Sequence, residues 1–149
     1  MRFPLGLLLA VMVGLWGCNQ QPRVAQKLPP IVGAWLVKSP EAPFPLHVFV
    51  FHADGTIVQS NPEAGNPKTS DSNLMGQWVA DGDGIKGKLI EVSADRNTHK
   101  FVSRGEISIA VTVRGNEFHG KANAVFYGPG EQIVGGPITA TLEGHRIVP

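Results

Sequence analysis

The sequence predicts an all-β protein of about eight antiparallel strands in a meander, most simply closed into an up-and-down barrel. Its 18 Gly and 12 Pro residues disfavour long helices. Apolar, β-branched runs are separated by turn-forming residues, and no stretch longer than about six residues repeats with the helical period. Successive hairpins favour a barrel because closure removes the exposed sheet edges, while a β-sandwich is the alternative with the same strand pattern.

The first half of the domain is expected to supply four strands, each an apolar run that ends at a turn. They are 31–38, 46–52, 56–59 and 74–80. Asp54-Gly55 lies between two of these runs and is the clearest hairpin signal in the chain. Residues 60–72 are polar, lack periodicity and are expected to form a loop of about 13 residues, a length typical of either a functional or a mobile segment.

The second half is expected to supply the remaining strands. They are 85–93, 99–113, 117–126 and 132–147. The run 99–113 forms either one long strand or two strands with a break near Arg104. In 117–126, small or apolar residues alternate with polar ones at a period of two, as in a half-buried strand. The last strand is expected to bulge at the Gly-Gly-Pro sequence of 135–137.

The N-terminus has the pattern of an export signal. Arg2 precedes an apolar run of about 14 residues, which is shorter than the roughly 20 that a membrane-crossing helix needs. The run ends at Leu15-Trp16-Gly17-Cys18, after which the chain becomes polar at once. This tetrapeptide resembles the lipobox of bacterial lipoproteins, in which a branched apolar residue and a small residue precede the acylated cysteine. Trp16 departs from the pattern, because a smaller residue is usual there.

The lipobox resemblance implies that signal peptidase II cuts before Cys18, which then becomes a diacylated N-terminus. We therefore expect a signal peptide (1–17), a flexible tether (18–30) and a single barrel domain (31–149). The resemblance also implies an exported protein that is anchored through Cys18, on the periplasmic side of an outer membrane or at the cell surface, depending on the cell. Cys18 is the only cysteine, so no internal disulfide can hold the fold together.

The charge of the chain argues against nucleic acid as a partner. The formal net charge is +1, and without Arg2 the basic and acidic residues balance. Lys and Arg are scattered singly along the sequence, so neither a nucleic-acid surface nor a polybasic membrane patch is expected. The oligomeric state is left open.

Two short motifs bear on the kind of barrel. Gly33-Ala34-Trp35 at the head of the first strand resembles the Gly-x-Trp of lipocalins, in which the Trp seals the closed end. We expect Arg146 of the last strand to stack over Trp35, as a late Arg does in that family. A second Gly-x-Trp ends at Trp78. The pattern also looks like lipocalin-like or calycin-like small exported bacterial domains, a resemblance that implies a fold more than a function. From the anchor, the meander and the small inward residues of 117–126, we expect a barrel that binds a small apolar ligand or a lipid.

The candidate ligand-lining residues are the aromatic residues of the strands, one glutamate and three small residues of one strand. They are Trp35, Phe49, Phe51, Trp78, Glu91, Phe101, Phe118, Gly120, Ala122 and Ala124. Small inward residues leave room for one small ligand in an eight-stranded barrel, or else Trp35, Trp78 and Phe101 fill that room. Glu91 either points inward or, if its strand changes face at a bulge, lies in water.

No catalytic triad, Cys-His pair or phosphate-binding loop occurs, so we expect no catalytic residue and no cofactor. The histidines are expected to be ordinary surface or strand-end residues rather than metal ligands. They are His47, His52, His99, His119 and His145. Two other functions stay open. One is an envelope interaction or structural module that uses its outer surface or the 60–72 loop. The other is an isomerase or cyclase resembling allene-oxide-cyclase and dirigent-like barrels, with Glu91 or a histidine as acid or base.

Overall fold

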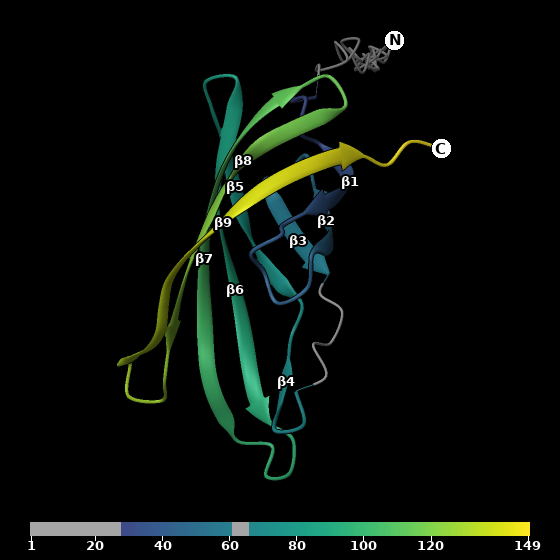
Figure 1. Ribbon diagram of the computed structural model, residues 1–149. Coiled ribbons are helices and arrows are strands. Elements are labelled where there is room, and N and C mark those ends of the chain that lie inside the picture. Colours follow the sequence, from purple (N-terminus) through teal and green to yellow (C-terminus); the bar gives the residue numbers. More distant parts are fainter. Residues whose placement is uncertain (1–27, 61–65) are drawn as a thin grey trace, which may run out of the picture.

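The strands form one closed antiparallel barrel. The computed structural model describes residues 28–60 and 66–149. The strands are β1 (Gly33–Lys38), β2 (Leu46–Phe51), β3 (Thr56–Ser60), β4 (Thr69–Asp71), β5 (Leu74–Asp81), β6 (Gly84–Asp95), β7 (Phe101–Arg114), β8 (Glu117–Tyr127) and β9 (Ile133–Arg146). All except β4 follow one another around the barrel, which closes because β1 pairs with β9 and β6 with β7 (Figure 1). The predicted lipocalin-like, up-and-down barrel is confirmed, and the sandwich alternative is wrong.

One side of the barrel is much longer than the other. β7 and β9 have 14 residues each, whereas β1 and β2 have 6 and β3 has 5. The long strands therefore run past the short ones at one end (Figure 1). The extra strand β4 pairs with the protruding part of β6, where Asp71 lies opposite Ser93.

Three local predictions can be compared with the structure. The hairpin at Asp54-Gly55 is confirmed: Thr56 N–H donates to Asp54 Oδ1 at 2.8 Å, and Gly55 has a φ of 90°, which suits glycine. β7 is one unbroken strand through Arg104. The expected irregularity near Gly135 is confirmed by register shifts between β8 and β9 at that point.

The predicted loop over 60–72 is only partly a loop. Thr69 to Asp71 form β4, because these residues supply hydrogen-bond partners to the overhanging backbone of β6. Ser72 continues this role, since its Oγ accepts a hydrogen bond from Val92 N–H at 3.0 Å. Residues 61–65 of the predicted loop lie outside the described part of the chain.

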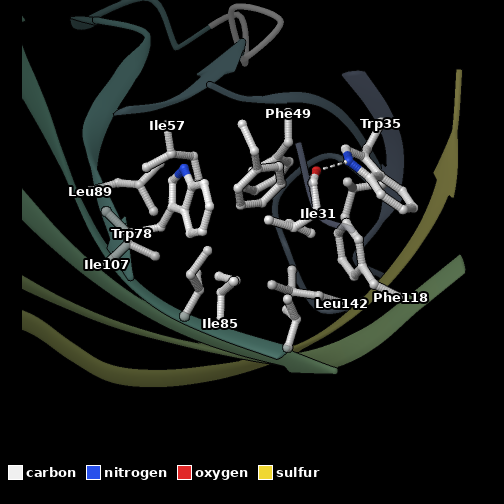
Figure 2. Packing of buried hydrophobic residues seen from close by; sticks show 14 of the residues in the cluster. Ile31, Trp35, Phe49, Ile57, Trp78, Ile85, Leu89, Ile107, Phe118 and Leu142 are labelled. Atoms are coloured by element: carbon white, nitrogen blue, oxygen red, sulfur yellow. Dashed lines mark hydrogen bonds between the residues drawn. The ribbon is translucent and has the colours of Figure 1, made fainter. Parts of the chain in front are cut away.

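A chain of aromatic rings fills one end of the barrel. The ring centroids of Trp35 and Phe118 lie 5.0 Å apart, those of Phe118 and Phe51 6.2 Å, and those of Phe51 and Trp78 6.4 Å. Figure 2 shows the two tryptophans on either side of the cluster, with Phe49 between them. All five side chains are buried, so this end of the barrel is packed solid.

The segment before β1 and the end of β9 seal the packed end. Trp35 Nε1 donates to Ile31 O at 2.7 Å, and the Ile31 side chain is buried (Figure 2). Arg146 lies opposite Trp35 across the β1–β9 pair, with its guanidinium carbon 4.3 Å from the Trp35 ring centroid. Arg146 Nη1 donates to Val32 O at 2.8 Å, and Nη2 donates to Pro30 O. The predicted stacking of Arg146 over Trp35 is confirmed.

Candidate ligand-binding cavity

The other end of the barrel is hollow. A cavity of about 490 Å³ lies there, within the range of roughly 300–1,000 Å³ that small-molecule sites occupy. Its floor is the inner side of the packed core, because Phe49, Ile107 and Leu142 belong to both the core and the cavity lining. The barrel is therefore packed at the Trp35 end and hollow at the opposite end.

One wall of the cavity is apolar and comes from β7, β8 and β9. Its residues are Ile107, Ile109, Ala122, Ala124, Phe126, Ile138, Ala140 and Leu142. They occupy alternate positions on each strand, as inward-facing residues of a barrel do. The methyl side chains of Ala122 and Ala124, which are paired with β7 and β9, leave the space that a larger residue would fill.

The facing wall is polar and comes from β2, β3, β4, β6 and the start of β7. Its polar residues are His47, Gln59, Asp71, Glu91, Ser93 and Ser103. Ser93 Oγ donates to Asp71 Oδ1 at 2.5 Å across the β4–β6 pair. Glu91 lies on this wall because the register shift of β6 comes only after it, between Ser93 and Ala94.

A buried polar pair stands where the polar wall meets the floor. His47 is 6% exposed and Gln59 8%, and Gln59 Nε2 lies 3.1 Å from His47 Nδ1. This contact joins the side chains of two neighbouring strands, β2 and β3. His47 is not a surface residue: it lies near the start of β2 and is buried, because it shares a strand face with Phe49 and Phe51.

Residues 39–45, which we call the strap, connect β1 to β2 and line the cavity from a third side. The Glu41 carboxylate accepts hydrogen bonds from Thr141 N–H at 3.1 Å and Thr141 Oγ1 at 3.0 Å. The Phe44 ring lies 5.1 Å from the His47 ring. The strap is thus fastened to β9 by Glu41 and contacts the polar wall through Phe44.

Removing the charge of Glu41 is expected to loosen the strap. The hydrogen bond from the Thr141 backbone lowers the pKa of Glu41, so the ionised carboxylate is the form that holds the strap. Because the pKa of Glu41 is lower in the folded state, its carboxylate stabilises the strap at pH values above the ordinary Glu pKa. This stabilisation is lost as the pH falls through the folded-state pKa. In Glu41→Gln we expect hydrogen exchange of the Thr141 amide to rise roughly two- to fivefold at pH 7, since a hydrogen bond to an exposed carboxylate is screened by water and contributes little.

The control for this prediction is Glu143→Gln, which removes the same charge two residues further along β9. It should leave exchange at Thr141 within error of the wild type. In the wild type, exchange corrected for its intrinsic pH dependence should rise below the ordinary Glu pKa, and this rise should vanish in Glu41→Gln. Equal protection of Thr141 in both variants would contradict the proposed fastening.

The candidate lining residues from the sequence divide between the cavity, the closed end and the surface. Phe49, Glu91, Ala122 and Ala124 line the cavity. Trp35, Phe51, Trp78 and Phe118 pack in the closed end. Phe101, at the start of β7, is 45% exposed. Gly120 sits where β8 approaches β7 closely: an added Cβ would overlap the Ala110 carbonyl and lie 2.6 Å from Val111 Cγ1.

The fold and its cavity define a lipocalin-like barrel with room for one small ligand. No family model, curated protein or solved structure matches this chain. Over residues 28–60 and 66–149 there is no helix with the length and hydropathy needed to cross a membrane. In the same residues, no three His, Cys, Asp or Glu side chains gather as metal ligands would. Cys18 lies outside the described part of the chain.

Proposed function

We propose that this protein binds a small apolar ligand or a lipid in the hollow end of its barrel. The observation that carries the proposal is the cavity of about 490 Å³ with one continuous apolar wall. Burying the apolar body of a ligand against that wall stabilises the complex by roughly 25 cal/mol per Å² removed from water. The strap adds further apolar contacts from Pro43 and Phe44 at the third side.

We further propose that the barrel is held at a membrane by acyl chains on Cys18. The support is the sequence Leu15-Trp16-Gly17-Cys18 after a short apolar run. In a cell with two membranes the protein would face the periplasm from the outer membrane, and in other cells it would lie at the surface. Two or more acyl chains give stable anchoring, whereas a single chain binds only marginally.

Filling the cavity tests the binding function. Ala124→Trp places an indole in the space beside the apolar wall. We expect it to weaken binding of a neutral fluorescent probe, N-phenyl-1-naphthylamine, by more than about tenfold, because two ring systems cannot occupy one cavity. Fluorescence enhancement on titration measures the affinity.

The matched control is Asn123→Trp, which puts the same side chain on the exposed face of β8 one residue earlier. It should bind the probe like the wild type. Urea unfolding of both variants shows that they are folded under the conditions of the titration. Wild-type affinity in a folded Ala124→Trp variant would rule out this cavity as the binding site.

A further inference from the structure

The outside of the barrel is apolar on the side of the short strands. Alternate residues of β1, β2, β3, β5 and β6 point away from the core, and many of these outward residues are apolar. The exposed fractions of Leu36, Val48 and Met75 are 43%, 38% and 62%. We call this surface the apolar outer face, and it consists of Ala34, Leu36, Leu46, Val48, Val50, Val58, Met75 and Ile90.

Strand register makes the apolar outer face continuous. One row of directly opposite residues crosses four strand pairs and consists of Ala34, Val50, Val58, Met75 and Ile90. Leu36 and Val48 form a second row beside it. No charged residue interrupts either row. A continuous exposed apolar surface is typical of a site that binds a partner or a lipid surface.

The opposite side of the barrel, on β7, β8 and β9, has a polar outer surface. Ser108, Asn123 and Thr139 lie opposite one another there, and the Thr139 hydroxyl donates to Asn123 Oδ1 at 2.7 Å. The neighbouring row contains Lys121 and Thr141. Where the barrel is closed, one side is therefore suited to water and the other to an apolar surface.

We infer that the apolar outer face lies on the lipid surface to which the protein is anchored, and this inference rests on the proposed function, namely the acylation of Cys18. Leu28 follows Cys18 by ten positions, and an extended chain reaches at most about 3.3–3.6 Å per residue. The chain then enters β1 at Gly33, and Ala34 and Leu36 of this strand belong to the apolar outer face. This face therefore begins on the first strand after the anchor.

The anchor favours lipid over a second copy of the chain as the occupant. Acyl chains in the bilayer would keep the lipid surface within about 35 Å of Leu28, so that docking is intramolecular and its effective concentration is high. A second copy reaches the apolar outer face only by diffusion, at its own concentration. Binding of an apolar surface to lipid scales with the area that it buries. In this arrangement the barrel lies on its side, with β7, β8 and β9 turned away from the membrane.

Labels on the two sides of the barrel test this arrangement. Leu36→Cys and Ser108→Cys each add one free thiol to the protein acylated at Cys18, and the fluorophore NBD is attached to it. The labelled proteins are added to preformed vesicles of phosphatidylethanolamine and phosphatidylglycerol. Dithionite, which bleaches NBD from the water phase, should act on the label at position 36 about fivefold more slowly or less. Equal rates at the two positions would overturn the inference, while flotation with the vesicles would leave the anchor intact.

Two matched double variants locate the contact. Val48→Thr combined with Met75→Gln makes the apolar outer face more polar and should speed bleaching at position 36 about threefold or more. Val134→Thr combined with Ile133→Gln makes the same kind of change to exposed side chains of β9 at the hollow end and should leave the rate unchanged. Circular dichroism shows that both variants are folded. Equal effects of the two variants would contradict docking through this face.

The amount of protein on each vesicle separates lipid from a second copy as the occupant. If lipid covers the apolar outer face, protection of the label at position 36 is independent of the ratio of protein to lipid. Protection that disappears at low ratios would show that a second copy covers the face and would overturn the inference. A wild-type protein that does not float with the vesicles would overturn both the anchor and the docking, because nothing would then hold the face near lipid.

Discussion

Replacing Trp35 with alanine is expected to lower the free energy of unfolding by about 3–5 kcal/mol, the usual cost of removing a large buried aromatic side chain. Trp35 is fully buried, packs on Phe118 and carries the Arg146 guanidinium over its ring. Its Nε1–H also donates a hydrogen bond to the carbonyl oxygen of Ile31. The variant loses these contacts together and leaves Arg146 without the ring beneath it. Because domains of this size are stable by only about 5–15 kcal/mol, most of the margin would disappear.

Urea unfolding followed by circular dichroism measures this loss, with the midpoint expected to fall by roughly 2 M at an unchanged slope. Leu36→Ala is the matched control, since it removes a 43% exposed side chain from the next position on the same strand. It should change stability by no more than about 0.5–1 kcal/mol. If the two variants were equally stable, Trp35 would not be the seal of the closed end.

Replacing Cys18 with serine is expected to move the protein from the membrane fraction to the soluble fraction. Cys18 is the only cysteine of the chain, so the substitution removes its only thiol. Each buried methylene of an acyl chain contributes about 0.8 kcal/mol to membrane binding, and the loss of all chains removes the whole of that term. Ultracentrifugation of cell extracts followed by immunoblotting measures the distribution.

Asn19→Ser is the control, because it introduces the same side chain one residue later and keeps the thiol. Growth with labelled palmitate gives a second measurement: the wild type and Asn19→Ser should take up the label, and Cys18→Ser should not. An unlabelled wild-type protein would show that the chain is not acylated, whatever fraction it is found in.

The alternation of residues along the strands predicted which side chains face inward, but not where along the barrel axis they lie. Trp35 and Phe118 were grouped with Ala122 and Ala124 as candidate ligand-lining residues because all were expected to point inward. The structure separates them: the rings pack the closed end, and the alanines line the cavity. The level of a residue in a barrel depends on strand tilt and register, which a period of two does not contain.

Two other predictions, for Phe101 and Gly120, differ from the structure for local physical reasons. The sequence predicts that Phe101 faces the interior. Pairing between β7 and β8 begins only at Arg104, which lies opposite Tyr127. Phe101 comes before Arg104 on β7, so β8 does not cover it and its side chain is exposed. The sequence pattern predicts that Gly120 leaves room for a ligand. The neighbouring strand comes so close at Ala110 and Val111 that a side chain at Gly120 would collide with it.

The polar half of the cavity was the part that sequence patterns identified least well. His47 has the same parity as Phe49 and Phe51, which is a signal that it faces inward. Its partner Gln59 comes from the next strand, and their pairing depends on the β2–β3 register. A single polar residue at an inward position predicts a buried group, but its partner becomes known only with the register.

The closure of the barrel by β1 and β9 has a consequence for how the protein is made. Arg146 and Val32 bond across 114 positions of the chain, so the seal joins the first strand to the last. Synthesis starts at the N-terminus, and the Arg146 guanidinium that covers the Trp35 ring is added only with the final residues. Contacts of such long sequence separation form late and slowly. The barrel therefore closes only after the whole of β9 has been synthesised, because the β1–β9 pair needs both ends of the domain.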